Sequence, residues 1–314
     1  MLASIACIAI DWGTSNRRAW ALATSGAVLA ARGDDQGLLA IEDRDFAGSL
    51  RRFAGDWLKG RPPVIMCGMI GSRLGWRDVP YLEAPVPLRE IGRHLLAVDG
   101  FDDAPLRIVP GIALRAEAHA DVMRGEECQM LGALLARGRR DGIFLLPGTH
   151  AKWAILKDGV LIYFRTYMTG ELFGLLRSSG SLSQVMPAKG EAEQFDAGAF
   201  DRGLGKGLDG AGITHLLFSV RSLSLFGQLT PAEAPSYLSG LLIGAEMKDA
   251  LGWLKVLQAG THVTAIGSVR LLQTYGRAAA RCNIELSRLE SDDILPPALF
   301  AIARGAGLIA EPAA

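Results

Sequence analysis

Two stretches of this sequence share one pattern, in which an apolar strand runs into a Gly-Thr turn and a second apolar strand follows. The first stretch covers residues 8–20 and the second covers residues 143–155. Each second strand then reaches a turn signal that contains Gly, as in a β-hairpin. Two such units, about one domain length apart, indicate a duplicated domain rather than a short-period repeat. The chain is therefore expected to fold as two related halves.

The first turn carries groups that suit a polyphosphate. Asp11 ends the first strand, and Gly13-Thr14 open the turn after it. Backbone N–H groups of such a turn can face anionic oxygens, and a carboxylate beside phosphates is a usual ligand of Mg²⁺. A single Asp-x-Gly-Thr pattern is also an ordinary turn between strands, so the second copy at Gly148-Thr149 strengthens the interpretation. If the two turns face one another, each could hold one end of a triphosphate.

The composition limits the partners that the chain can have. Its 314 residues include 33 Lys and Arg, 33 Asp and Glu, and 49% hydrophobic residues. With no net charge, the chain has no general field that attracts nucleic acid or an anionic membrane. The four cysteines form no Cys-x-x-Cys pair, which favours reduced thiols in a cytoplasmic protein. No apolar run approaches the length of a membrane span, and no signal-peptide pattern is expected.

The order of expected elements is that of an α/β protein with mixed sheets. Apolar periodicity predicts helices over residues 45–58, 126–137, 231–257, 269–280 and 297–309, and a helix capped by Thr169. Short apolar runs predict strands over residues 64–67, 107–109, 160–164, 263–266 and 282–286. A break rich in Gly and Arg after residue 138 predicts two domains, residues 1–138 and 139–296. The C-terminal helix, within residues 297–312, is expected to pack back on the first domain.

A glycine-rich loop follows the strand predicted at residues 64–67. Residues 68–76 contain three glycines, a serine, an arginine and a tryptophan. Ligands of open α/β sheets tend to bind at such carboxyl ends of strands, so the loop is a candidate sugar site, although a plain flexible loop fits the same residues. The sequence has no P-loop, no Rossmann glycine fingerprint and no Gly-x-Ser-x-Gly elbow. Three arginines are candidates to grip a substrate carboxylate: Arg18, Arg73 and Arg165.

Two adjacent carboxylates, Glu126 and Glu127, stand in the first turn of the helix predicted over residues 126–137. Phosphoryl transfer requires positioning, charge neutralisation and a base for the acceptor hydroxyl. Adjacent side chains on a helix point in different directions, so at most one of the two is expected to act directly. The helix dipole alone also explains acidic residues at this place. The sequence therefore leaves the choice of base open.

Six motifs along the chain resemble the 2-dehydro-3-deoxygalactonokinase family. They include Ile-Asp-Trp-Gly-Thr-Ser-Asn-Arg-Arg-Ala-Trp (10–20), Cys-Gly-Met-Ile-Gly-Ser-Arg-Leu-Gly-Trp (67–76), Val-Met-Arg-Gly-Glu-Glu-Cys-Gln (122–129), Pro-Gly-Thr-His-Ala-Lys-Trp (147–153), Met-Thr-Gly-Glu-Leu (168–172) and Ser-Gly-Leu-Leu-Ile-Gly-Ala-Glu (239–246). The motifs occur in this order over nearly the full chain. The resemblance implies two duplicated actin-like (ribonuclease H-like) domains with mixed sheets flanked by helices and a nucleotide cleft between them. It also implies ATP- and Mg²⁺-dependent phosphorylation of 2-dehydro-3-deoxy-D-galactonate at its 6-hydroxyl.

The resemblance implies roles for residues at matching positions. The first phosphate and Mg²⁺ site comprises Asp11, Gly13, Thr14 and Asn16, with Asp11 as metal ligand. The second phosphate turn comprises Gly148, Thr149, His150 and Lys152, and the adenosine lies near Gly267 and Ser268. The sugar acid is assigned to Trp12, Arg18, Gly68, Met69, Gly71, Ser72, Trp76 and Thr169. Glu126 is the expected base, with Glu127 and then Asp121 as alternatives, whereas many sugar kinases use Asp for this role.

Other functions stay open on the sequence alone. One is a kinase for another sugar acid or sugar, because nothing in the sequence indicates which configuration at C4 the substrate has. A second is a non-catalytic ATP-binding switch or sugar sensor, although such regulators commonly carry a helix-turn-helix segment that is not expected here. A third is a phosphatase, since a pair of glutamates also suits the activation of water. The expected partner is a small sugar acid, not nucleic acid or a membrane, and a homodimer is compatible with the sequence.

Overall fold

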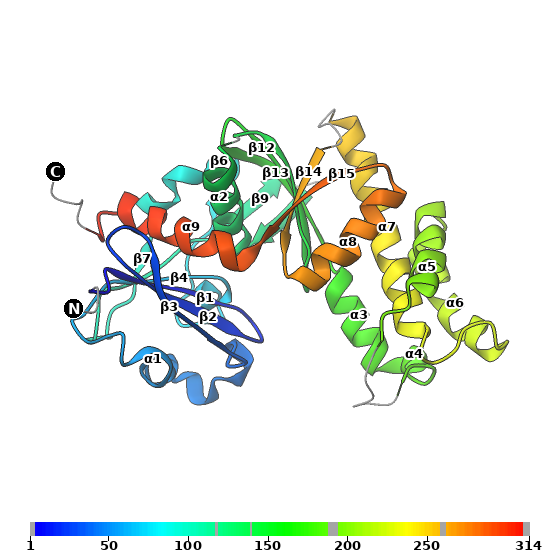
Figure 1. Ribbon diagram of the computed structural model, residues 1–314, viewed down its shortest axis with the longest axis horizontal. Helices are drawn as coiled ribbons and strands as arrows, with labels where there is room; N and C mark the ends of the chain where they lie inside the picture. The colour runs from blue at the N-terminus through cyan, green and yellow to red at the C-terminus, as the bar shows by residue number, and fades with distance from the viewer. Residues whose placement is uncertain (1–3, 117–118, 139, 188–193, 258–261, 310–314) are drawn as a thin grey trace. The chain divides into compact units, whose positions relative to one another are not determined.

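The computed structural model describes residues 4–116, 119–138, 140–187, 194–257 and 262–309 (Figure 1). The chain divides into two units. The first unit takes in Met1–Gly142, Ala154–Phe164 and Leu289–Ala314, and the second takes in Ile143–Trp153 and Arg165–Arg288. Among the helices that the structure describes, none is both long and apolar enough to cross a membrane.

The first unit is built on a six-stranded sheet of order β3-β2-β1-β4-β8-β7. Its strands are β1 (Cys7–Trp12), β2 (Arg17–Leu22), β3 (Val28–Asp34), β4 (Val64–Cys67), β7 (Leu96–Ala97) and β8 (Leu106–Ile108). Strand β1 runs antiparallel to β2 and parallel to β4, so that Asp11 pairs with Arg18 on one side and with Cys67 on the other. The central strands β1 and β4 are apolar on both faces because both faces of this part of the sheet are covered.

Helices cover this sheet on both faces (Figure 1). Helix α1 (Phe46–Ala54) packs Phe46, Leu50 and Phe53 against Ile8, Ile10 and Trp12 of β1 in the main core of the unit. Helix α9 (Ser291–Gly305) packs against β1 and against α2 (Glu126–Arg137). The end of the chain therefore completes the first unit rather than the second.

Smaller elements complete the first unit. A three-stranded sheet has the order β10-β9-β5, with β5 at Leu82–Glu83, β9 at Ile112–Ala116 and β10 at His119–Met123. Short 3₁₀ helices are η1 (Leu38–Ala40), η2 (Glu42–Arg44), η3 (Met69–Gly71) and η4 (Leu88–His94). Strand β6 (Val86–Pro87) pairs with the start of β13 (Val160–Tyr167). Residues 77–105 therefore hold only short elements.

The third sheet has the order β15-β14-β11-β12-β13-β6. Its other strands are β11 (Gly142–Leu146), β12 (Ala151–Lys157), β14 (His262–Gly267) and β15 (Glu285–Glu290). The helices of the second unit are α3 (Thr169–Ser178), α4 (Gly180–Ser183), α5 (Ala197–Asp209), α6 (Ile213–Leu225), α7 (Ala234–Val256) and α8 (Val269–Arg281). Helix α7 packs against α3, α5, α6 and α8. A Cβ at Gly240 of α7 would lie 2.1 Å from the carbonyl oxygen of Phe200 in α5, so glycine at this position allows the two helices to pack closely.

The two large sheets repeat one strand order. The first reads β3-β2-β1-β4-β8, and the third reads β13-β12-β11-β14-β15. In each sheet the strand that precedes the Gly-Thr turn lies between the strand that follows the turn and a parallel partner, β4 or β14. The structure therefore confirms the α/β class with mixed sheets and supports the duplication expected from the two turns.

Two boundary predictions in the second unit are wrong. Thr169 is not the N-cap of α3, because it is the first helical residue and its hydroxyl donates to Glu246. The long helix begins at Ala234, later than the expected Thr230-Pro231. The hydroxyl of Thr230 accepts from the Glu233 N–H and the Glu233 carboxylate accepts from the Thr230 N–H, so a pair of capping contacts forms just before the helix.

The boundaries near the C-terminus also shift. Helix α9 begins at Ser291, and Pro296 and Pro297 lie inside it rather than at its start. Asp292 and Asp293 occupy the first turn of α9, where the helix dipole favours acidic side chains. Strand β15 begins at Glu285 instead of Cys282, because α8 continues to Arg281 and a turn follows.

Candidate active site

The first Gly-Thr turn is a tight, exposed connection between β1 and β2. The N–H of Gly13 donates to the carbonyl oxygen of Asn16 at 2.9 Å and closes the turn. The N–H groups of Leu38 and Leu39 donate to the carbonyl oxygens of Gly13 and Thr14. Thr14 and Asn16 remain exposed. The turn is therefore braced from behind while its hydroxyl and amide groups face solvent.

Asp11 is held at the end of β1, beside this turn. Its Oδ2 accepts a hydrogen bond from Nη2 of Arg18 at 2.6 Å, and the thiol of Cys67 lies 3.7 Å from its Oδ1. Gly68 has a φ of 86°, and a Cβ there would lie 2.9 Å from Oδ1 of Asp11. Only glycine fits both the backbone angle and the space. The carboxylate therefore lies directly against the loop that follows β4.

Arg18 bridges two carboxylates. Its guanidinium also donates to Asp292 at the start of α9. Burial lowers the pKa of Arg18, but the charges and hydrogen bonds of Asp11 and Asp292 outweigh this effect, and the pKa of Arg18 is raised. Arg18, which the sequence suggested for the substrate, orients Asp11 in this structure.

The two glutamates of α2 lie in different environments. Glu127 is fully buried, and both of its oxygens accept from the N–H of Gly125, at 2.8 and 2.7 Å. Burial, and then the charge of Glu126, raise the pKa of Glu127 to about 7. Glu126 is half-buried, and its Oε2 accepts from the backbone N–H of Arg124 at 2.9 Å. Of the pair, only Glu126 has surface that a substrate could reach.

The start of α2 meets the loop after β4. A Cβ at Gly125 would lie 3.3 Å from the Cα of Gly68, the residue that touches Asp11. The structure thus brings together Asp11, Gly68 and the Gly125–Glu127 turn from three separate parts of the sequence. Asp121, the third candidate base, is half-buried in β10, and its carboxylate accepts from the Val122 N–H.

Free thiols lie beneath this cluster. Cys67 and Cys128 are both fully buried, and Cys128 lies 3.5 Å from Oε1 of Glu127. The hydrogen bond between the thiols lowers the pKa of Cys67, but burial and the neighbouring carboxylates raise it to about 11. Burial raises the pKa of Cys128 well above its usual range. Both are therefore neutral, unreactive thiols that pack the base of the cluster.

The glycine-rich loop contributes backbone rather than aromatic surface. It begins as η3, where the hydroxyl of Ser72 donates to the carbonyl oxygen of Met69, and Gly71 is buried. Trp76 packs between Phe46 and Phe101, with ring centroids 6.2 and 5.6 Å away.

Trp12, the other tryptophan that the sequence suggested for the substrate, is fully buried. Its indole N–H donates to the carbonyl oxygen of Gln36 at 3.1 Å, and its ring packs edge-on against Phe46. The Trp12 ring has no surface for a ligand, and the half-buried Trp76 ring packs against the core. Trp12 is therefore left out of the candidate sugar site, whereas the assignment of Trp76 to it stays a prediction.

The second Gly-Thr turn connects β11 and β12 and lies in the second unit. The N–H of Glu171 donates to the carbonyl oxygen of Thr149 at 2.9 Å, and the Glu171 carboxylate lies 2.5 Å from Nε2 of His150. Lys152 is buried, and its Nζ donates to the carbonyl oxygen of His150 at 3.0 Å. A lysine cation therefore lies against the backbone of this turn.

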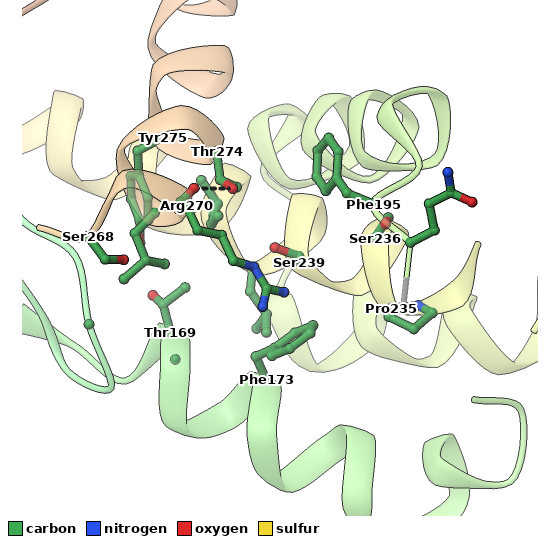
Figure 2. Close-up of a pocket in the computed structure, with 16 residues that line it drawn as sticks. Thr169, Phe173, Phe195, Pro235, Ser236, Ser239, Ser268, Arg270, Thr274 and Tyr275 are labelled. Carbon is green, nitrogen blue, oxygen red and sulfur yellow. Dashed lines mark hydrogen bonds between the residues drawn. The ribbon is translucent and has the colours of Figure 1, made fainter. Parts of the chain in front are cut away.

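A cavity of about 670 Å³ opens beside the second turn (Figure 2). Figure 2 shows Thr169, Ser268 and Tyr275 at one end and Phe195 and Pro235 at the other, with Arg270, Ser239 and Phe173 between them. Gly148 of the second turn also lines the cavity, whereas Gly267 packs against Pro147 just outside it. The volume falls in the usual range of small-molecule sites. The cavity joins one predicted phosphate residue, Gly148, to one predicted adenosine residue, Ser268.

The residues around this cavity come from α3, the segment before α5, α7 and α8. Two of the motifs quoted above, at residues 168–172 and 239–246, cover part of them, but neither motif predicted a shared cavity. Of the lining residues, only Gly148 and Ser268 were predicted to bind the nucleotide. Thr169, which the resemblance gave to the sugar acid, lines this cavity instead.

No cluster of three or more His, Cys, Asp or Glu side chains that could hold a metal ion occurs among the described residues. A metal at Asp11 would therefore need other ligands. This donor set fits Mg²⁺, which is usually bound by one or two carboxylates together with water and phosphate oxygens.

Comparisons with known proteins agree on one family. A family model described as 2-keto-3-deoxy-galactonokinase matches residues 11–302. The probable 2-dehydro-3-deoxygalactonokinase DgoK1 of Rhizobium meliloti (strain 1021) is 37% identical over 300 residues, which cover 94% of this chain and 96% of that protein. The 2-dehydro-3-deoxygalactonokinase of Escherichia coli (strain K12) is 35% identical over 263 residues, 82% of this chain and 86% of that one. A crystal structure of a Sinorhizobium meliloti protein, provisionally described as a 2-dehydro-3-deoxygalactonokinase, has a TM-score of 0.86 and 36% identity and covers 95% of this chain and 98% of its own.

Proposed function

Because the chain belongs to the 2-keto-3-deoxy-galactonokinase family, we propose that it phosphorylates 2-dehydro-3-deoxy-D-galactonate with ATP. The product is 2-dehydro-3-deoxy-6-phospho-D-galactonate, and the reaction belongs to galactonate catabolism in the cytoplasm. The observation that carries the proposal is the convergence of Asp11, Gly68 and Glu126 in the first unit, since these residues supply a metal ligand, a close backbone approach and a base.

Glu126 is the proposed base. In the reaction, the 6-hydroxyl oxygen bonds to the γ-phosphorus of ATP, the bond from that phosphorus to the β–γ bridging oxygen breaks, and ADP leaves. The hydroxyl proton passes to the Glu126 carboxylate, which is half-buried and held by the Arg124 N–H. Glu127 has no surface for the substrate, so its proposed role is to fix the Gly125 turn against Gly68.

Asp11 is the proposed ligand of Mg²⁺. Its carboxylate is already anchored by Arg18, which leaves it a fixed acceptor at the edge of the first turn. When bound, Mg²⁺ would neutralise charge on the phosphates. Thr14 and Asn16, both exposed, are proposed to bind phosphate oxygens beside it. Met69, Gly71 and Ser72 are proposed to border the sugar acid, since they follow Gly68 in the same loop.

The second unit is proposed to bind the nucleotide. The Gly148–His150 turn and the buried Lys152 cation suit phosphate oxygens, which favour backbone N–H groups and positive charge. The neighbouring cavity is large enough for a nucleoside, and Phe173 and Phe195 offer aromatic surface to a base on the side away from Ser268 (Figure 2). That the two turns face one another across the units stays a prediction.

A coupled ADP-release assay tests this function. We expect release from Mg²⁺-ATP with 2-dehydro-3-deoxy-D-galactonate, weak release with its gluconate epimer and none without a sugar acid. Equal rates with both epimers would support kinase activity but contradict a specificity for the galactonate compound. Release without any sugar acid would instead indicate an ATPase or an ATP-dependent switch.

A further inference from the structure

A buried carboxylate behind the cavity of the second unit carries a further inference. Glu246 of α7 is 3% exposed and does not line the cavity itself. Its Oε1 accepts from the indole N–H of Trp153 at 2.8 Å. Its Oε2 accepts from the hydroxyl of Tyr275 at 2.7 Å and from the hydroxyl of Thr169 at 2.5 Å. The three donors come from β12, α8 and α3, so Glu246 ties three elements together.

The chemistry of these partners fixes the direction of each hydrogen bond. The indole of Trp153 can only donate, so Oε1 must accept. An ionised carboxylate can only accept, so the hydroxyl hydrogens of Thr169 and Tyr275 both point to Oε2. Burial raises the pKa of Glu246 and outweighs the hydrogen bonds from Thr169, Trp153 and Tyr275, which lower it. Three donors are the arrangement that makes a buried carboxylate tolerable.

This direction has a consequence inside the cavity. Thr169 and Tyr275 both line it, at the same end as Ser268 (Figure 2). Since the single hydrogen of each hydroxyl is already committed to Glu246, Thr169 can offer the cavity only its oxygen lone pairs. A ligand group at this place must therefore donate a hydrogen bond.

We propose that Glu246 is a positioning residue that makes the Thr169 hydroxyl an obligatory acceptor, and that this acceptor recognises a ribose hydroxyl of the nucleotide. The assignment rests on the proposed function, in which Gly148 belongs to the phosphate turn and Phe173 and Phe195 face the base. Phosphate oxygens carry no hydrogen to donate and are disfavoured at an acceptor. The ribose lies between phosphate and base, and its hydroxyls are donors.

Direct nucleotide binding tests the inference without the sugar acid. Isothermal titration calorimetry compares ADP with its 2′-deoxy-2′-fluoro and 3′-deoxy-3′-fluoro analogues, which keep a polar substituent but have no hydrogen to donate. In the unaltered protein, we expect one of the fluoro analogues to bind about tenfold more weakly than ADP.

Two variants should remove this preference. Thr169→Val keeps the shape of the side chain but deletes the acceptor. Glu246→Gln keeps the acceptor for Trp153 but places an amide N–H₂ against the hydroxyls, so that their hydrogens turn toward the cavity. In both variants we expect the ratio of affinities between the fluoro analogue and ADP to fall to about twofold or less.

Tyr237→Phe is the matched control. It removes another buried hydroxyl of α7, which pairs with Ser219 and does not line the cavity, so the tenfold preference should remain. A preference that survives in Thr169→Val and Glu246→Gln would overturn the inference, and so would equal binding of ADP and both analogues by the unaltered protein. Absence of ADP binding to the unaltered protein would overturn the proposed nucleotide site itself, and the inference with it.

Discussion

The two Gly-Thr turns share a backbone plan but carry opposite charges. Each turn joins two neighbouring strands of a sheet with the same strand order, and each is braced by a second segment, Leu38–Leu39 in one case and the start of α3 in the other. The first turn follows Asp11, an acid paired with Arg18. The second is followed by Lys152, a buried cation against the turn carbonyl.

This difference shows what a duplicated domain keeps and what it changes. The strand order and the turn geometry depend on backbone hydrogen bonding and apolar packing, which both copies need in order to fold. The residues that flank the turns are free to differ once the copies act on different parts of one ligand. We therefore expect substitutions at the first turn to affect chemistry and substitutions at the second to affect nucleotide binding.

Asp11→Asn tests the expectation that the first turn serves the chemistry, and its effect should be the largest. The amide keeps the size of the side chain and can still accept from Arg18, but it is a much weaker ligand for Mg²⁺. We expect kcat to fall by about a thousandfold with the thermal unfolding midpoint little changed. Steady-state kinetics at saturating Mg²⁺-ATP measures this loss.

The matched control for Asp11→Asn is Asp56→Asn, which removes another carboxylate paired with an arginine, Arg32, at an exposed position. Exposed pairs contribute little, so this variant should keep full activity. Unchanged turnover in Asp11→Asn would mean that Asp11 is not the metal ligand.

Glu126→Gln and Glu127→Gln separate chemistry from structure within the first unit. We expect Glu126→Gln to lower kcat about a hundredfold, because the base is lost. Glu127→Gln should lower kcat by less than about tenfold, because the buried glutamine can still accept from the Gly125 N–H. The kcat values of the two variants at one pH make the comparison, and the reverse ranking would move the base to Glu127.

The sequence predicted elements that depend on neighbouring residues, but not contacts between segments that are distant along the chain. Strand β4 and helix α2 have the predicted bounds, Val64–Cys67 and Glu126–Arg137, because apolar runs and helix signals lie within a few residues of each other. The two turns were found because their pattern is short and occurs twice. The contact between Gly68 and Gly125 depends on how β4 and α2 pack, and no spacing along the chain encodes it.

The tryptophans and the cavity show the same limit. Trp12 and Trp76 looked like sugar-binding aromatics because they stand in a glycine-rich context. Their partners Phe46 and Phe101 are distant in sequence, and packing against them buries Trp12 in the core and leaves Trp76 half-buried at its edge. The cavity of the second unit is likewise assembled from several helices, so of its end residues only Ser268 was predicted to bind the nucleotide, while Thr169 was assigned to the sugar acid.

Gly170→Ala tests the expectation that the second turn serves nucleotide binding. A Cβ at Gly170 would lie 2.3 Å from the carbonyl oxygen of Gly148, so the second turn must move. We expect the KM for ATP to rise about tenfold, while the KM for the sugar acid stays within about twofold.

Gly174→Ala, on the same helix, is the control, because no atom lies within 4 Å of the added Cβ. It should keep the KM for ATP and stabilise α3 by up to about 1 kcal/mol. Equal kinetic effects of the two alanines would contradict the role of α3 in bracing the turn.

The smallest expected effect concerns the two buried glutamates, one in each unit. Glu246 accepts from an indole and two hydroxyls, whereas Glu127 accepts from the Gly125 N–H with both oxygens and from the weakly donating thiol of Cys128. Glu127 has a pKa of about 7 in the folded chain, raised from 4.5 by burial and by the charge of Glu126, while the nearby charge of Arg124 lowers it. A raised folded pKa means that the folded state holds the proton more tightly than the unfolded chain, so this contribution to stability is present below about pH 4.5 and is lost as the pH rises through about 7.

Glutamine cannot ionise, so the Glu127→Gln variant does not lose this contribution. The unfolding midpoint of the variant, measured relative to that of the unaltered protein, should therefore rise by a few degrees between pH 5 and pH 8. Thermal unfolding of both proteins in matched buffers at the two pH values measures the change. A difference in midpoint that stays constant with pH would show that Glu127 does not titrate in this range. Glu127 would then keep one charge state from pH 5 to pH 8, and the contrast with the fully hydrogen-bonded Glu246 would lie in geometry alone.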